Sequence, residues 1–140
     1  MSPERDTELC SKYPLIFKHR NGTIMDTCMA WGFECGDGWF DLLDTLCGEI
    51  QRYVNWKSKD LSQEEKESLQ VVASQVKEKF GTLRFYYYGG DDTTGGMIDM
   101  AEALSAKICE DCGVPGKIRA DGWNRTLCNS CESQRKNKKS

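Results

Sequence analysis

The sequence has few of the features that mark membrane proteins and the common enzyme classes. No apolar run approaches the length that spans a membrane. Walker loops, GxSxG, HExxH and dinucleotide-binding fingerprints are all missing. The single histidine, His19, has no nucleophile-and-base pattern nearby, so we interpret it as a surface or turn residue. We therefore expect a protein that does not span a membrane and is not an enzyme.

An excess of positive charge is missing too. With 19 Lys and Arg residues against 22 Asp and Glu residues, the net charge of -3 argues against a protein that coats nucleic acid. Residues 1–6 lead into no apolar segment, so we expect no signal peptide and a cytoplasmic protein, in which thiols stay reduced. The 140 residues suit one compact domain with a small metal-stabilised appendage.

Cysteine, by contrast, is abundant, and four of the eight cysteines form two matched pairs near the end of the chain. Two thiolates spaced as CxxC can hold one edge of a metal tetrahedron, and the fifteen residues between the pairs let the second pair complete it. Four protein thiolates leave no open position for water, which makes the metal structural. The sequence predicts one structural Zn²⁺ bound by Cys109, Cys112, Cys128 and Cys131. Two disulfides are the alternative.

The other four cysteines form no such pattern. We interpret Cys10, Cys28, Cys35 and Cys47 as free thiols, and whether they do more than pack is left open. A second metal site using Cys28 and Cys35 is the alternative, but the six residues between them form no compact knuckle.

The surroundings of the CxxC pairs predict a treble-clef-like module. Gly113 follows the first pair and can take the positive φ that turns backbone N–H groups toward sulfur. The second pair leads into a segment with helical character, and a helix N-terminus stabilises thiolates. Residues 127–131 resemble the C-terminal half of GATA-type zinc fingers, with a shorter spacer. That resemblance implies a nucleic-acid-reading finger, with the basic residues 135–139 as its tail.

Apolar periodicity predicts helices over residues 38–53, from residue 62 onward and over residues 96–107. Asp37 is a plausible N-cap for the first, and Ser62 with Glu65 has the form of a capping box for the second. Residues 89–96 read as a flexible acidic loop. The expected fold class is α+β, a small helical and β-hairpin domain with a C-terminal zinc module. We expect a flexible N-terminus, core domain, zinc module and basic tail over residues 1–12, 13–107, 108–134 and 135–140.

Residues 70–88 permit two interpretations. The aromatic, alternating segment 82–88 is a strand in both. In the favoured one, residues 70–79 form the partner strand of a hairpin that turns at Phe80-Gly81, although Phe is unfavourable where φ is positive. In the other, the preceding helix continues to Phe80 and Gly81 ends it.

The hairpin predicts a candidate ligand site. With the turn at Phe80-Gly81, Lys77 lies directly opposite Arg84, and opposed like charges are destabilising unless an anion lies between them. Such an anion would be a phosphate, with a tyrosine for stacking on a base. The candidate ligand-binding residues on this face are Gln75, Lys77, Lys79, Arg84 and Tyr86. The alternative is an ordinary solvated sheet face with Glu78 or Glu34 as counter-charge.

A second candidate lies in the segment from Trp31 to Trp39, where glycines alternate with aromatic residues and carboxylates. Trp31, Trp39, Glu34 and Asp37 would line a recognition pocket. Alternatively, the two carboxylates act as an acid/base pair, or they cap the next helix and pair with a basic residue.

Four features together resemble a family of small proteins of bacteriophages and prophages: WGFECGDGW at 31–39, QVKEKFGTLRFY at 75–86, Ala101-Glu102 with Ser105, and the zinc knuckles. The likeness spans roughly residues 12–132. It implies an accessory protein in the host bacterial cytosol that counters host defence. The expected function is a non-catalytic inhibitor or sequestering agent that recognises an anionic ligand, which is a nucleotide-type signal or an acidic surface of a host defence protein. The alternative is a nucleic-acid-binding accessory factor that uses the zinc module and basic tail. A homo-oligomer is possible, and no membrane partner is expected.

Overall fold

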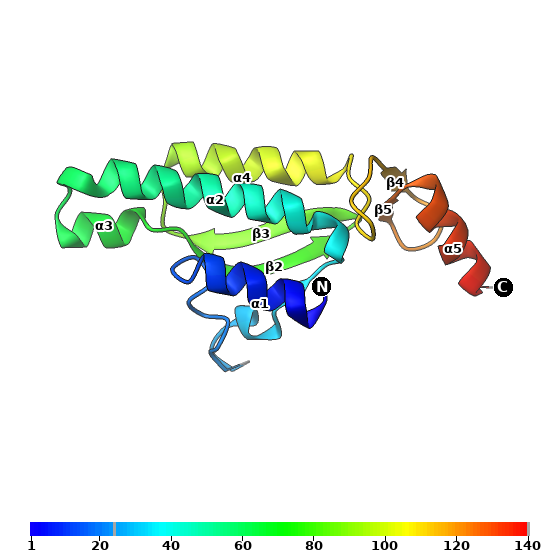
Figure 1. Ribbon diagram of the computed structural model, residues 1–140, viewed down its shortest axis with the longest axis horizontal. Coiled ribbons are helices and arrows are strands. Elements are labelled where there is room, and N and C mark those ends of the chain that lie inside the picture. The colour runs from blue at the N-terminus through cyan, green and yellow to red at the C-terminus, as the bar shows by residue number, and fades with distance from the viewer. Residues whose placement is uncertain (24, 140) are drawn as a thin grey trace.

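The computed structural model describes residues 1–23 and 25–139, and within them it is an α+β fold, as predicted (Figure 1). The helices are α1 (Pro3–Lys12), α2 (Phe40–Lys57), α3 (Gln63–Leu69), α4 (Asp92–Ser105) and α5 (Asn129–Lys139), with 3-10 turns η1 (Cys28–Trp31), η2 (Asp37–Trp39) and η3 (Ser58–Asp60). The strands are β1 (Phe33–Glu34), β2 (Val72–Lys79), β3 (Thr82–Tyr88), β4 (Lys117–Arg119) and β5 (Arg125–Leu127). Within the part of the chain that is described, no helix combines the length and apolar character needed to cross a membrane.

A three-stranded sheet forms the centre of the larger part of the molecule. Its strand order is β1-β2-β3, with β1 parallel and β3 antiparallel to β2. The helices α2 and α4 lie side by side over one face of this sheet (Figure 1). Alternate residues of the strands, among them Val76, Leu83 and Phe85, are buried in the core with Leu43 and Ile50 of α2. The other alternate positions are left on the opposite face.

The hairpin interpretation of residues 70–88 is confirmed. The helix α3 ends at Leu69, and β2 and β3 pair in the register that places the turn at Phe80-Gly81. Both turn residues have positive φ, 55° at Phe80 and 90° at Gly81, as a two-residue hairpin turn requires. Phe80 is the one non-glycine residue with positive φ in the described chain. Because phenylalanine is unfavourable at positive φ, the sequence also permitted a helix over these residues.

Helix starts agree with the sequence in one case and differ in two. Ser62 and Glu65 form the predicted capping box at the start of α3. Asp37 does not cap α2, because its Oδ1 accepts a hydrogen bond from the Ser2 N–H at 2.7 Å. The helix α4 begins at Asp92, earlier than expected, because Asp91 and Thr94 form a second capping box. Part of the predicted flexible loop 89–96 is therefore helical.

Both predicted terminal segments differ from the structure. Residues 3–12 are not loose but form α1, in which Leu9 is fully buried and Asp6 pairs with Arg20 at 3.0 Å. The proposed basic tail from residue 135 onward continues α5, and Arg135 is paired with Glu132 at 3.1 Å. Contacts with residues outside each helix support both segments: Asp6 of α1 pairs with Arg20, and Arg135 of α5 donates a hydrogen bond to the Trp123 carbonyl oxygen at 2.8 Å.

The outer edge of the sheet is closed by side chains of α4. β3 is an edge strand, so its outward N–H groups need partners. The Leu83 N–H donates to Ser105 Oγ at 2.8 Å, and the Phe85 N–H donates to Glu102 Oε2 at 2.8 Å. Glu102 and Ser105 therefore replace a fourth strand.

Candidate functional site

The four predicted metal ligands come together in the part of the fold that holds β4, β5 and α5, at the end of the molecule opposite to α3 (Figure 1). The Sγ atoms of Cys109, Cys112, Cys128 and Cys131 all lie within 4.8 Å of one another. The Cys112 and Cys128 Sγ atoms are 3.7 Å apart. A tetrahedron with Zn–S bonds of about 2.3 Å has an edge of about 3.8 Å, whereas a disulfide would require about 2 Å. The cluster therefore fits a four-thiolate metal site and rules out the disulfide alternative for this arrangement.

The backbone around the sulfur atoms has features that favour the thiolate form, which binds metals. Gly113 takes a φ of 85°, as expected after the first CxxC pair. The Cys131 N–H at the start of α5 donates to Cys128 Sγ at 3.4 Å, and this backbone hydrogen bond lowers the pKa of Cys128 to about 7. The order of knuckle, β4–β5 hairpin and ligand-bearing helix is the one predicted for a treble-clef-like module.

The metal module is joined to the sheet domain by buried hydrogen bonds. The Gly38 N–H donates to the Glu110 carbonyl oxygen at 2.7 Å, and Trp39 Nε1 donates to the Ile108 carbonyl oxygen at 2.9 Å. A Cβ at Gly38 would lie 2.1 Å from the Cys109 carbonyl oxygen, so only glycine fits there. The segment from Trp31 to Trp39 is thus a joint between the two parts of the fold.

This joint accounts for most of the residues that were proposed to line a pocket in the segment. Trp39 is fully buried, so it is not available to a ligand, and Asp37 is engaged by Ser2. Trp31 is 62% exposed, but it does not line the large groove described below. Glu34 lies on β1 beside β2, where its Oε1 accepts a hydrogen bond from Gln75 at 3.2 Å. The two carboxylates have separate partners, which is the reason that we do not interpret them as an acid/base pair.

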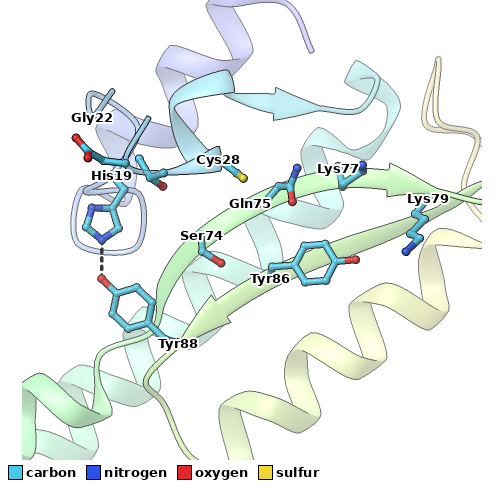
Figure 2. A pocket seen from close by; sticks show the side chains of 11 residues that line it. His19, Gly22, Cys28, Ser74, Gln75, Lys77, Lys79, Tyr86 and Tyr88 are labelled. Atoms are coloured by element: carbon cyan, nitrogen blue, oxygen red, sulfur yellow. Dashed lines mark hydrogen bonds between the residues drawn. The ribbon is translucent and has the colours of Figure 1, made fainter. Parts of the chain in front are cut away.

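A large hollow lies on the sheet face that α2 and α4 leave open. Its volume is about 870 Å³, and β2, β3 and residues 19–22 and 26–28 form its walls (Figure 2). We call it the sheet groove. The side chains that line it include those of His19, Asp26, Gln75, Lys77, Lys79, Tyr86 and Tyr88.

The predicted register brings the candidate ligand-binding residues to this groove, with one exception. Lys77 pairs with Arg84 and Gln75 with Tyr86, as expected from the turn. Gln75, Lys77, Lys79 and Tyr86 all line the groove. Arg84 does not, because its Nη1 donates to Thr82 Oγ1 at 2.9 Å and lies along its own strand. Lys77 and Lys79, and not Arg84, are therefore the basic side chains that line the groove.

Neither lysine of the groove has a close carboxylate partner, although Glu34 of β1 is the register partner of Lys77. Lys77 and Lys79 form no ion pair with any residue in ranges 1–23 and 25–139. Glu78, suggested as a counter-charge, instead accepts a hydrogen bond from the Gly81 N–H at 3.3 Å. The Lys79 ammonium lies 5.7 Å from the Phe80 ring centroid, a cation–π contact that leaves its charge uncompensated.

The sequence analysis missed two residues at the other end of the groove. His19 Nε2 is hydrogen-bonded to the Tyr88 hydroxyl at 2.6 Å, across 69 positions of sequence. The sequence could have predicted Tyr88 as a groove residue, because it lies two residues after Tyr86 and therefore on the same face of the strand. His19 had no comparable signal in the sequence beyond its turn context. A register shift between Ala73 and Gln75 also adds Ser74 to the groove wall.

Polar side chains lie at both ends of the groove. Figure 2 shows His19 and Tyr88 at one end, Lys77 and Lys79 at the other, and Tyr86 between them. Asp26 belongs to the wall that residues 26–28 form, and its Oδ2 accepts a hydrogen bond from Thr23 Oγ1 at 2.7 Å. A ligand that carries its negative charge at one end and hydrogen-bond donors at the other would match this arrangement.

The chain matches no family model, no curated protein sequence and no solved structure. The resemblance to small phage proteins therefore stays a prediction, and the interpretation of the site depends on its geometry.

Proposed function

We propose that the protein is a non-catalytic binding protein for a nucleotide-type anion, which it holds in the sheet groove. One observation carries the proposal: Lys77 and Lys79 lie unpaired beside the exposed ring of Tyr86 in a groove of about 870 Å³. Lysines bind phosphate as point charges, and an exposed aromatic ring offers a stacking surface to a base.

The polarity of the groove gives the ligand an orientation. Its phosphate would contact the two lysines, and its base would stack on Tyr86. Asp26 and the His19–Tyr88 pair would then meet the far side of the base or the sugar hydroxyls. A carboxylate accepts hydrogen bonds from the exocyclic amines of bases, so this end of the groove would provide selectivity.

Binding without turnover is the mode that the groove supports best. A histidine that acts as a general base is normally oriented by a carboxylate, whereas His19 is hydrogen-bonded to a tyrosine and has no carboxylate partner among the described residues. The ligand would therefore be sequestered and released unchanged. The cytosol of a bacterial host, where a phage protein would remove a defence signal, is the setting that the sequence resemblance suggests.

The metal module would serve this function structurally. We propose Zn²⁺ as the metal, because four thiolates in a tetrahedral cluster suit zinc and leave no open coordination position. Its place at the tip of the hairpin supports a role in fixing the groove.

Nucleic-acid binding by α5 is the weaker candidate. Arg135 is 12% exposed and paired with Glu132, and Lys136 lies 3.8 Å from carboxylates of both Glu132 and Asp121. These cations are already partly compensated, which reduces the charge that α5 would present to a phosphate backbone.

A thermal-shift screen with a panel of nucleotides tests the proposal. A ligand at 100 times its Kd should stabilise the protein by about 2.7 kcal/mol. The double variant K77Q/K79Q should lose this shift, whereas K59Q/K107Q, which removes two exposed lysines outside the groove, should retain it. Chromatography of the recovered ligand should show it unmodified. A screen without any shift, an unaffected double variant or a chemically altered ligand would each refute the proposal.

A further inference from the structure

A second hollow continues the sheet groove beyond the lysines. Its volume is about 440 Å³, and Lys77 and Lys79 line it as well as the first. Phe80, at the hairpin turn, and Trp123, from the metal module, form its aromatic walls. They are 68% and 70% exposed. Two large apolar rings are therefore held in solvent directly beside two unpaired cations.

Contacts of the backbone hold the two positions that carry these rings. Gly81, next to Phe80, lies against the β5 backbone so closely that a Cβ there would be 3.2 Å from the Arg125 nitrogen. The Trp123 carbonyl oxygen accepts a hydrogen bond from Arg135 Nη1 at 2.8 Å. The two rings therefore come from the two parts of the fold but share one wall, and their exposure is maintained by contacts of the backbone behind them.

The order of side chains along the surface is aromatic, cationic and aromatic. Tyr86 lies on one side of Lys77 and Lys79, and Phe80 and Trp123 lie on the other. A mononucleotide bound as proposed above would leave the second hollow empty. A phosphodiester with a nucleoside on each side would place its charge at the lysines and one base in each hollow.

We infer that the ligand of the sheet groove contains at least two nucleosides joined by a phosphodiester, with the second base bound between Phe80 and Trp123. This inference rests on the proposed function, since it assumes a nucleotide phosphate at Lys77 and Lys79. The same chemistry occurs in a discrete dinucleotide and in the interior of a single-stranded nucleic acid, and the experiment separates these two sources.

Calorimetric titration of the metal-loaded protein with AMP, the dinucleotide ApA and single-stranded deoxyadenosine and adenosine decamers tests the inference. ApA should bind about tenfold or more tightly than AMP, because one further base stacks on an aromatic ring. The variant Trp123→Leu should reduce ApA affinity to that of AMP and leave AMP binding unchanged. Trp123→Phe, which keeps an aromatic ring, should restore most of the affinity.

Matched controls separate stacking from loss of structure. Trp56→Leu removes another exposed tryptophan, 61% exposed and outside both hollows, and should change no affinity. Metal content measured on Trp123→Leu should equal that of the wild type. A parallel titration series with guanosine nucleotides shows whether the difference in affinity depends on the choice of base.

Each outcome has a definite meaning. A decamer that binds more tightly than the dinucleotide, with strong salt dependence, supports the inference and assigns the ligand to single-stranded nucleic acid. A decamer that binds no better supports it and assigns the ligand to a discrete dinucleotide. Equal affinity for mononucleotide and dinucleotide, with no effect of Trp123→Leu, overturns the inference and leaves the proposed function standing. Absence of binding by every nucleotide overturns both.

Discussion

Thr126 of β5 donates a hydrogen bond from Oγ1 to the carbonyl oxygen of Gly81, at 2.7 Å and in a fully buried position. The bond joins the metal module to the turn of the hairpin, 45 positions apart in the sequence. Phe80 belongs to this turn, and Lys79 directly precedes it. Lys79 and the exposed Phe80 ring are therefore linked through Gly81 to the metal module.

Replacement of Thr126 measures the strength of this connection. Thr126→Val has nearly the same shape but leaves the Gly81 carbonyl oxygen buried and unpaired, which should lower the free energy of unfolding by about 1–3 kcal/mol. Thr126→Ser keeps the hydroxyl and should cost less. Urea denaturation of both variants provides the comparison, and equal stability of the two would show that the bond contributes nothing.

Removal of the metal should unfold the module and loosen the hairpin turn while the sheet domain stays folded, because the core residues of that domain do not include the ligands Cys112, Cys128 and Cys131. Metal analysis should give one ion per chain, and Cys112→Ser should abolish it. The matched control is Cys28→Ser, which changes an exposed thiol outside the cluster. Hydrogen exchange after chelation should be faster at β5 and at Gly81. Unchanged exchange with the metal removed would contradict a structural role.

The edge of β3 offers an independent test of the fold. Glu102→Ala leaves the Phe85 N–H without its partner and should lower the free energy of unfolding by about 1–3 kcal/mol. It should also promote association through the exposed strand edge, detectable by light scattering. Glu102→Gln retains an acceptor oxygen and should be milder, and Asp99→Asn, on the exposed face of α4, should be neutral. Wild-type behaviour of Glu102→Ala would argue against the edge-closing role.

Thiol reactivity should single out Cys28 in the metal-loaded protein. Burial raises the pKa of Cys35 to about 12, and burial together with the Asp6 carboxylate raises that of Cys10 to about 12, so these thiols stay protonated and unreactive at neutral pH. Cys28 is exposed and lines the sheet groove. Alkylation at pH 8 followed by mass spectrometry should give one fast adduct, and Cys28→Ser should remove it. Fast labelling of Cys10 or Cys35 would contradict the packing described here.

The parts of the fold that follow local patterns could be predicted from the sequence. The CxxC spacing predicts the metal cluster, and the alternation of Leu83 to Tyr86 predicts a strand with one buried and one open face. The capping box formed by Ser62 and Glu65 predicts the start of α3, because its donors and acceptors lie within one helical turn of the sequence.

The remaining features depend on contacts between distant residues. The sequence does not indicate that His19 meets Tyr88, or that Glu102 and Ser105 accept hydrogen bonds from β3. The strand register predicts which face of the sheet Arg84 lies on, but it does not predict the direction of the Arg84 side chain. The Arg84 guanidinium donates a hydrogen bond to Thr82 along the strand and does not reach the groove. The alternation of residues in the sequence does not indicate which hydrogen-bond acceptor such a side chain will choose.

The most direct test of the account is the position at which a nucleotide binds. Titration of the isotope-labelled, metal-loaded protein with ApA, followed by amide chemical shifts, should give the largest changes at Lys77, Lys79 and Tyr86, with smaller changes at Trp123. The residues of α2 and the C-terminal turn of α5 should not respond. Changes centred on α5, or none at all at saturating dinucleotide, would contradict a nucleotide site in the sheet groove.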